Sequence, residues 1–198
     1  MKEEKVVVVF PSLFSLNKIE SLLSNLKKIL KTRGQKFGRI QKDDSVIVIH
    51  ANDEVAASSI INSIFGIERI AIAKKIDNKF NLIISTITKI GSSVLLRGEK
   101  FYVKAEGHSS TYLPKDIELA ATSSLIEKTT DLQVKPGTED NHDRLLYTHL
   151  TKSSAYICIF VDKGSGGIPY NSQKEQTVCC VHDEFSAISC LQTIKMGF

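Results

Sequence analysis

The chain has 198 residues, of which 42% are hydrophobic and 24% charged, with a formal net charge of +4. These values are ordinary for one large or two small globular domains. The apolar runs are far shorter than the roughly 18 residues of a membrane helix, and the N-terminus lacks the apolar stretch of a signal peptide. The sequence therefore predicts a soluble, cytoplasmic protein with no membrane partner.

Residues 1–78 alternate short apolar strands with helix-like segments. EKVVVVF reads as a buried strand, and the apolar residues between Leu16 and Leu30 recur at helical spacing, with Ser15 as a possible cap and Gly34 as the stop. Two strands in QKFGRIQ and SVIVIH, a helix capped by Asn52 or Asp53, and a strand in RIAIAKKI follow. The order β-α-β-β-α-β predicts an N-terminal ferredoxin-like domain.

Residues 79–170 predict a second α/β domain. A helix reaches Gly91 or beyond, EKFYVKAEG forms a strand, and Pro114 opens another helix. LQVKPG predicts a strand and a turn, RLLYTHLT and AYICIFVDK predict a hairpin, and a glycine-rich connection, GSGGIPYNSQ, follows it. The fold class expected for the chain is α+β, with the ferredoxin-like domain packed on the second domain.

Residues 171–198, in QTVCCVHDEFSAISCLQTIKMGF, have the outline of a strand, a turn and a helix. This outline is that of a phosphate-binding loop, but the turn holds His182, Asp183 and Glu184 where glycines would be expected. We expect a strand and a helix that pack four apolar residues against the second domain: Val178, Cys180, Ile188 and Leu191.

Cysteines and histidines give no sign of catalysis. All four cysteines lie in apolar segments without a CxxC spacing, which predicts buried free thiols. The five histidines show no metal-ligand spacing, and no Ser/His/Asp arrangement can be specified. We therefore predict no catalytic residue, no metal site and no cofactor.

Basic residues gather in two places that could contact nucleic acid. The segment from Lys18 to Lys42 carries eight basic residues and one acid, and its alternatives are a solvated helix face or an electrostatic footprint for nucleic acid. In LLRGEKFYVK, aromatic and basic residues interleave, so that one strand face could track a single-stranded end. An ordinary solvated strand face explains the second pattern equally well.

Several motifs together resemble the tRNA 4-thiouridine synthetase (ThiI) family. LRGEKFYVKAEG resembles the start of the THUMP module, and AYICIFVDKGSGGIP resembles its end. LLSNLKKIL and IFGIERIAIA resemble segments of the ferredoxin-like domain that precedes THUMP in that family. The resemblance covers essentially the whole chain and implies a THUMP domain over residues 79–170 and tRNA, held by its acceptor stem and 3′ end, as the ligand.

By the same resemblance, residues 171–198 are expected to be a degenerate remnant, a strand and a helix, of a lost pyrophosphatase domain, with the family's nucleotide loop falling on Val181 to Ser186. Only Ser186 matches, and Asp183 and Glu184 place negative charge where an anion should bind. ATP binding is therefore not expected. The basic end of the THUMP pattern falls on Glu106 and Gly107, so that Lys104 alone keeps the charge.

The sequence thus predicts a tRNA-binding THUMP protein, non-catalytic on its own, that assists tRNA modification with a separately encoded enzyme. One alternative is a subunit of a tRNA sulfurtransferase that is active with a catalytic partner. The other is a scaffold with a decayed RNA surface, and a homodimer through residues 171–198 is also considered. The candidate RNA contacts are Arg97, Lys100, Lys104, His108, Lys115, Gly166, Gly167, Lys27, Lys28, Lys31, Arg33 and Arg39.

Overall fold

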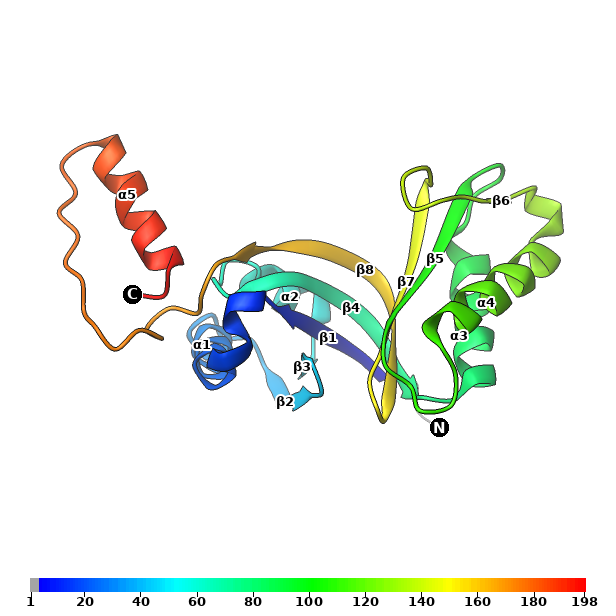
Figure 1. Cartoon of the computed structure of the whole chain (residues 1–198), viewed down its shortest axis with the longest axis horizontal. Helices are drawn as coiled ribbons and strands as arrows, with labels where there is room; N and C mark the ends of the chain where they lie inside the picture. Colours follow the sequence, from blue (N-terminus) through cyan, green and yellow to red (C-terminus); the bar gives the residue numbers. More distant parts are fainter. Residues whose placement is uncertain (1–3) are drawn as a thin grey trace. The chain divides into compact units, whose positions relative to one another are not determined.

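The computed structural model describes residues 4–198, whose helices and strands are drawn in Figure 1. They form two compact units, each with its own hydrophobic core. We call Val6–Ile72 together with Val161–Phe198 the terminal unit, and the other unit, mainly Ala73–Phe160, the central unit. The terminal unit is made of two segments of the chain, and most of the central unit lies between them in sequence. The predicted domains, in contrast, are consecutive segments with boundaries at 78 and 170, and these boundaries stay a prediction. No helix within residues 4–198 is long and apolar enough to cross a membrane.

The terminal unit contains the elements predicted for the first part of the chain. They are β1 (Glu4–Pro11), the 3-10 helix η1 (Leu13–Lys18), α1 (Ile19–Thr32), β2 (Phe37–Asp43), β3 (Val46–Ala51), α2 (Glu54–Ile61) and β4 (Ile67–Asp77). The strand order is β2-β3-β1-β4, and β3 is antiparallel to both of its neighbours. The predicted β-α-β-β-α-β order is confirmed, with η1 as an addition.

Helix α1 follows from its leucine spacing. Leu22, Leu26 and Leu30 recur every four residues and are fully buried in a core shared with β1, β3, α2 and β4. Gly34, at φ +68°, ends the helix as predicted. The prediction that Ser15 caps α1 is wrong, because Ser15 lies buried in η1 and shares a 2.7 Å hydrogen bond with the Ser12 hydroxyl.

The central unit has two helices on one face of its strands. Its elements are α3 (Phe80–Val94), β5 (Lys100–Gly107), α4 (Pro114–Lys128), the 3-10 helix η2 (Thr130–Leu132), β6 (Lys135–Pro136), β7 (Arg144–Leu150) and β8 (Ser154–Gly166), whose last residues belong to the terminal unit. The strand order is β8-β7-β5-β6, with β5 parallel to β6 and β7, and with the predicted hairpin between β7 and β8. This mixed sheet and its helices confirm the predicted α+β fold class.

Strand β5 separates a core face from a polar face. Phe101, Val103 and Ala105 are buried with residues of α3 and α4, as period-two alternation requires. Tyr102, Lys104 and Glu106 therefore lie on the opposite face, which we call the polar face of β5.

The segment after β8 differs from the prediction. Residues 184–195 form the expected helix, α5 (Glu184–Lys195), but residues 177–181 form no strand. A strand needs a neighbour for its backbone hydrogen bonds, and none of the described strands pairs with this segment.

The packing predicted for this segment is also wrong. Val178 is 88% exposed, Ile188 57% and Leu191 51%, and Cys180 is exposed as well. The prediction of buried thiols holds for Cys158 and fails for Cys179 and Cys180, which are exposed, and for the half-buried Cys190. An apolar run predicts burial only where another element covers it, and none of the residues of α5 is buried.

Candidate nucleic-acid interface

A stripe of cations lies on α1, opposite the buried leucines. Lys27, Lys28 and Lys31 are exposed, and their i, i+3 and i, i+4 spacing places them on neighbouring turns of one face. Arg33, at the end of α1, and Arg39, in β2, are exposed as well. Within residues 4–198, none of these five side chains makes an ion pair, so their charges are available to an anionic ligand.

A groove runs beside this stripe. It has a volume of about 350 Å³ and is lined by Asn25, Lys28, Ile29, Thr32, Ser63, Ile64, Phe65 and Tyr170. Tyr170 is 52% exposed, and the Asn25 amide donates to its backbone carbonyl at 2.9 Å, which fixes the tyrosine against α1. A cation next to exposed aromatic surface is the combination with which proteins hold a nucleic-acid backbone and stack a base.

The glycine-rich turn before Tyr170 positions this groove. The Gly66 N–H donates to the Gly166 carbonyl at 2.6 Å, and the Ser12 hydroxyl donates to the Gly167 carbonyl at 2.6 Å. A Cβ atom added at Gly66 would lie 2.8 Å from the Pro169 ring, so the glycine-rich turn packs closely against Gly66. The turn thus contacts residues of the first part of the chain, Ser12 and Gly66.

The five candidates in the central unit are not one cluster. Lys100 opens β5 and His108 follows its end, and a strand of this length spans about 23 Å. Arg97 precedes Lys100 in the turn before β5, whereas Lys104 and Lys115 come from the middle of β5 and the start of α4. These residues could touch one extended ligand only if it followed the length of the strand.

Two of these candidates, Lys104 and Lys115, are already ion-paired within the protein. The Lys104 ammonium contacts Glu139 at 2.5 Å and Glu106 at 3.2 Å, and Lys115 contacts Glu118 at 2.6 Å. The hydrogen bonds to Glu139 and then Glu106 raise the pKa of Lys104, and the hydrogen bond to Glu118 raises the pKa of Lys115. Lys100 donates to the Asn141 side chain at 3.2 Å.

Sequence reasoning missed the groove residues and the carboxylates. Phe65 and Tyr170 come from segments about 100 residues apart, and the one available signal was that Tyr170 directly follows the GSGGIP turn. Glu139 lies 35 residues from Lys104, with no local pattern that pairs them. Among the described residues, no group of three His, Cys, Asp or Glu side chains is arranged to hold a metal ion.

Comparison with known proteins finds similarity both in sequence and in fold. A probable tRNA sulfurtransferase of Streptococcus sanguinis strain SK36 is 22% identical over 153 residues, which are 76% of this chain and 37% of that protein. The structure of PH1313 from Pyrococcus horikoshii matches 98% of this chain and 66% of its own with a TM-score of 0.83 and 21% identity. No family model matches the chain.

A 4-thiouridine synthetase, solved in complex with RNA and bound ATP, matches 98% of this chain and 51% of its own, with a TM-score of 0.71 and 17% identity. The chain thus spans about a third of its curated relative and about half of this synthetase.

Proposed function

Since the predicted resemblance to the tRNA 4-thiouridine synthetases is confirmed in sequence and in fold, we propose that the chain binds tRNA and assists its modification. The observation that carries the proposal is the unpaired stripe of Lys27, Lys28 and Lys31 beside the groove with Tyr170. In this proposal the chain is non-catalytic on its own and works in the cytoplasm with a separately encoded modification enzyme. The predicted THUMP and ferredoxin-like domains are part of the same proposal.

The binding mode follows from the two parts of this surface. The lysines contact backbone phosphates without regard to sequence, because a phosphate offers charge but no base identity. The groove then receives the unpaired 3′ end beyond the acceptor stem, where a base can stack on the Tyr170 ring. The stem is held by shape and charge, and the single-stranded end is held by stacking.

A charge-removal experiment tests the proposal. We expect the triple variant Lys27→Ala, Lys28→Ala, Lys31→Ala to bind tRNA more weakly, with a slope of log affinity against log salt reduced by about one for each phosphate that the variant no longer neutralises. The measurement is a filter-binding titration of a full tRNA transcript and of an acceptor-stem hairpin across a salt series.

A matched variant controls for net charge. Lys128, Lys152 and Lys163 are exposed and have no ion pair in the described part of the chain, and their replacement by alanine removes the same charge. The control should lose much less affinity than the α1 variant. Equal losses in the two variants, or the absence of salt-sensitive tRNA binding by the wild type, would contradict the proposal.

One observation favours a second candidate, a subunit of a tRNA sulfurtransferase that acts with a catalytic partner. Phe185 is 80% exposed and Ile188 and Leu191 of the same helix are more than half exposed, which is unusual for large apolar side chains without a partner. ATP-dependent thiolation of tRNA only when a catalytic subunit is added would establish this function. A homodimer through residues 171–198 would instead show as a doubled mass in light scattering.

A further inference from the structure

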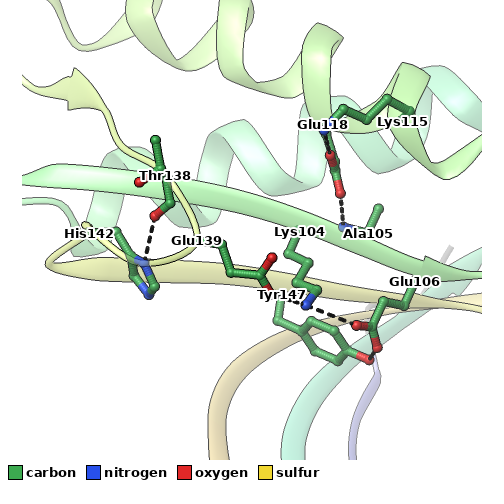
Figure 2. A network of polar contacts seen from close by, with 9 residues as sticks. All are labelled: Lys104, Ala105, Glu106, Lys115, Glu118, Thr138, Glu139, His142 and Tyr147. Atoms are coloured by element: carbon green, nitrogen blue, oxygen red, sulfur yellow. Dashed lines mark hydrogen bonds and ion pairs between the residues drawn. The ribbon is translucent and has the colours of Figure 1, made fainter.

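The polar face of β5 carries an ion-pair network of its own. The Lys104 ammonium lies between the carboxylates of Glu139 and Glu106, and Glu106 also accepts a 2.7 Å hydrogen bond from the Tyr147 hydroxyl (Figure 2). Lys104 keeps the basic charge of the pattern that the sequence shares with RNA-binding relatives, so its surroundings decide whether this charge can reach a ligand.

The two carboxylates are held very differently. The Glu106 side chain is 35% exposed and is hydrogen-bonded to Tyr147, which is itself only 1% exposed. Glu139 is 63% exposed and reaches Lys104 from the loop of residues 137–143. Glu106 is thus a built-in counterion of the strand, whereas the Glu139 carboxylate faces solvent and can be exchanged for another anion.

The loop nevertheless presents Glu139 from a defined position. The Gly137 N–H donates to the Phe101 carbonyl at 2.8 Å, and the Asp143 N–H donates to the Lys100 carbonyl at 2.8 Å. Between these anchors, the His142 ring nitrogen Nδ1 contacts the Thr138 carbonyl at 3.0 Å (Figure 2). Both ends of the loop are therefore tied to β5, and the carboxylate between them is directed at Lys104.

We propose that Glu139 is an internal competitor for RNA phosphate, which occupies Lys104 and lowers the affinity of the central unit for the RNA backbone. The carboxylate takes the place where a phosphate oxygen would meet the lysine, and even when displaced it leaves a negative charge beside the phosphate. Exposed ion pairs of this kind are weak, so a phosphate can replace Glu139 without disturbing the fold. This inference rests on the proposed tRNA binding.

The variant Glu139→Gln tests the proposal, because it keeps the side-chain shape and removes the charge. We expect it to bind tRNA roughly three- to tenfold more tightly than the wild type at low salt, with a salt slope steeper by about 0.7 to 0.9, the value of one additional phosphate contact. The matched control is Glu127→Gln, an equally conservative change at an exposed carboxylate on the last turn of α4, outside the network.

A second variant separates local competition from general charge. In a Lys104→Ala background, Glu139→Gln should give no more gain than Glu127→Gln does, since the lysine that it would release is absent. If Glu139→Gln and Glu127→Gln behave alike in the wild-type background, or if the gain persists without Lys104, the competitor role is wrong.

These outcomes leave the proposed function standing as long as the wild type binds tRNA in a salt-dependent way. If neither the wild type nor Glu139→Gln binds tRNA at all, both the proposed function and the competitor role are overturned. If Glu139→Gln binds tRNA more tightly than the wild type and Glu127→Gln does not, the result supports both the proposed function and the competitor role.

Discussion

Gly166 and Gly167 are neighbours with positive φ angles, yet a side chain would meet different surroundings at each. At Gly166, with φ +64°, an added Cβ would have no atom within 4 Å, whereas at Gly167, with φ +76°, it would lie 2.6 Å from the Lys195 carbonyl. The backbone conformation alone therefore explains the glycine at position 166. At position 167, the close approach of Lys195 also requires a glycine.

This difference predicts unequal costs for the same substitution. Gly166→Ala should lower the free energy of unfolding by about 1 to 2 kcal/mol, the usual cost of a left-handed conformation for alanine. Gly167→Ala should cost more, because the end of α5 must also move. Urea unfolding of both variants checks the order, and equal costs would mean that α5 shifts freely.

Lys104 gives a prediction in alkaline solution. Its raised pKa, due to Glu139 and Glu106, means that its ion pairs contribute stability that is fully present below the unfolded value of 10.5 and lost as pH rises through the folded value. At neutral pH, we expect Lys104→Met to cost no more than about 1 kcal/mol after solvent screening. That difference from the wild type should shrink above pH 10.5, measured by urea unfolding at pH 8 and pH 11.5, with Lys152→Met as the unpaired control.

Among the elements, those with a clear period could be predicted from the sequence. The leucines of α1 and the alternation of β5 each determine both the element and its buried face. The strand predicted in LQVKPG is confirmed as the short strand β6, whereas the strand predicted at 177–181 does not form, because strand pairing depends on a neighbour elsewhere in the chain. The candidate site shows the same limit. The lysines were visible in the sequence, but only the fold places Tyr170 and Lys28 in the lining of one groove and Glu139 against Lys104.

Helix α5 depends on its first residues. The Asp183 carboxylate accepts from the Ser186 N–H at 2.7 Å, and the Ser186 hydroxyl accepts from the Asp183 N–H at 2.9 Å. The backbone and hydroxyl of Ser186 lower the pKa of Asp183, so this cap is present above the ordinary value of 3.8 and lost as pH falls through the lower folded value. We expect Asp183→Ala to reduce the helical carbon chemical shifts of residues 185–188 at pH 7, and to diminish their change on acidification.

At the scale of the whole molecule, substitution of large side chains by alanine should have different effects in the two cores and in the exposed helix α5. Leu22→Ala, in the terminal unit, and Ile87→Ala, in the central unit, should each cost about 2 to 5 kcal/mol of unfolding free energy, since both side chains are buried. Leu191→Ala should change it by no more than about 0.5 kcal/mol, because half of that side chain is already exposed. A large, concentration-dependent loss for Leu191→Ala would instead reveal that another molecule covers α5.

The interleaving of the two units has a consequence for synthesis on the ribosome. The terminal unit includes Val6–Ile72 and Val161–Phe198, and the hydrogen bonds from Ser12 and Gly66 end on carbonyls near residue 167. The nascent chain can therefore complete the central unit before Gly166 and Gly167 are synthesised. About 95 residues separate Ile72 from Gly167, which is about 5 to 20 seconds of translation at 5 to 20 residues per second. Release of the chain before residue 161 would leave the segment that carries the lysine stripe without Tyr170, so the groove can form only after residue 170 has been synthesised.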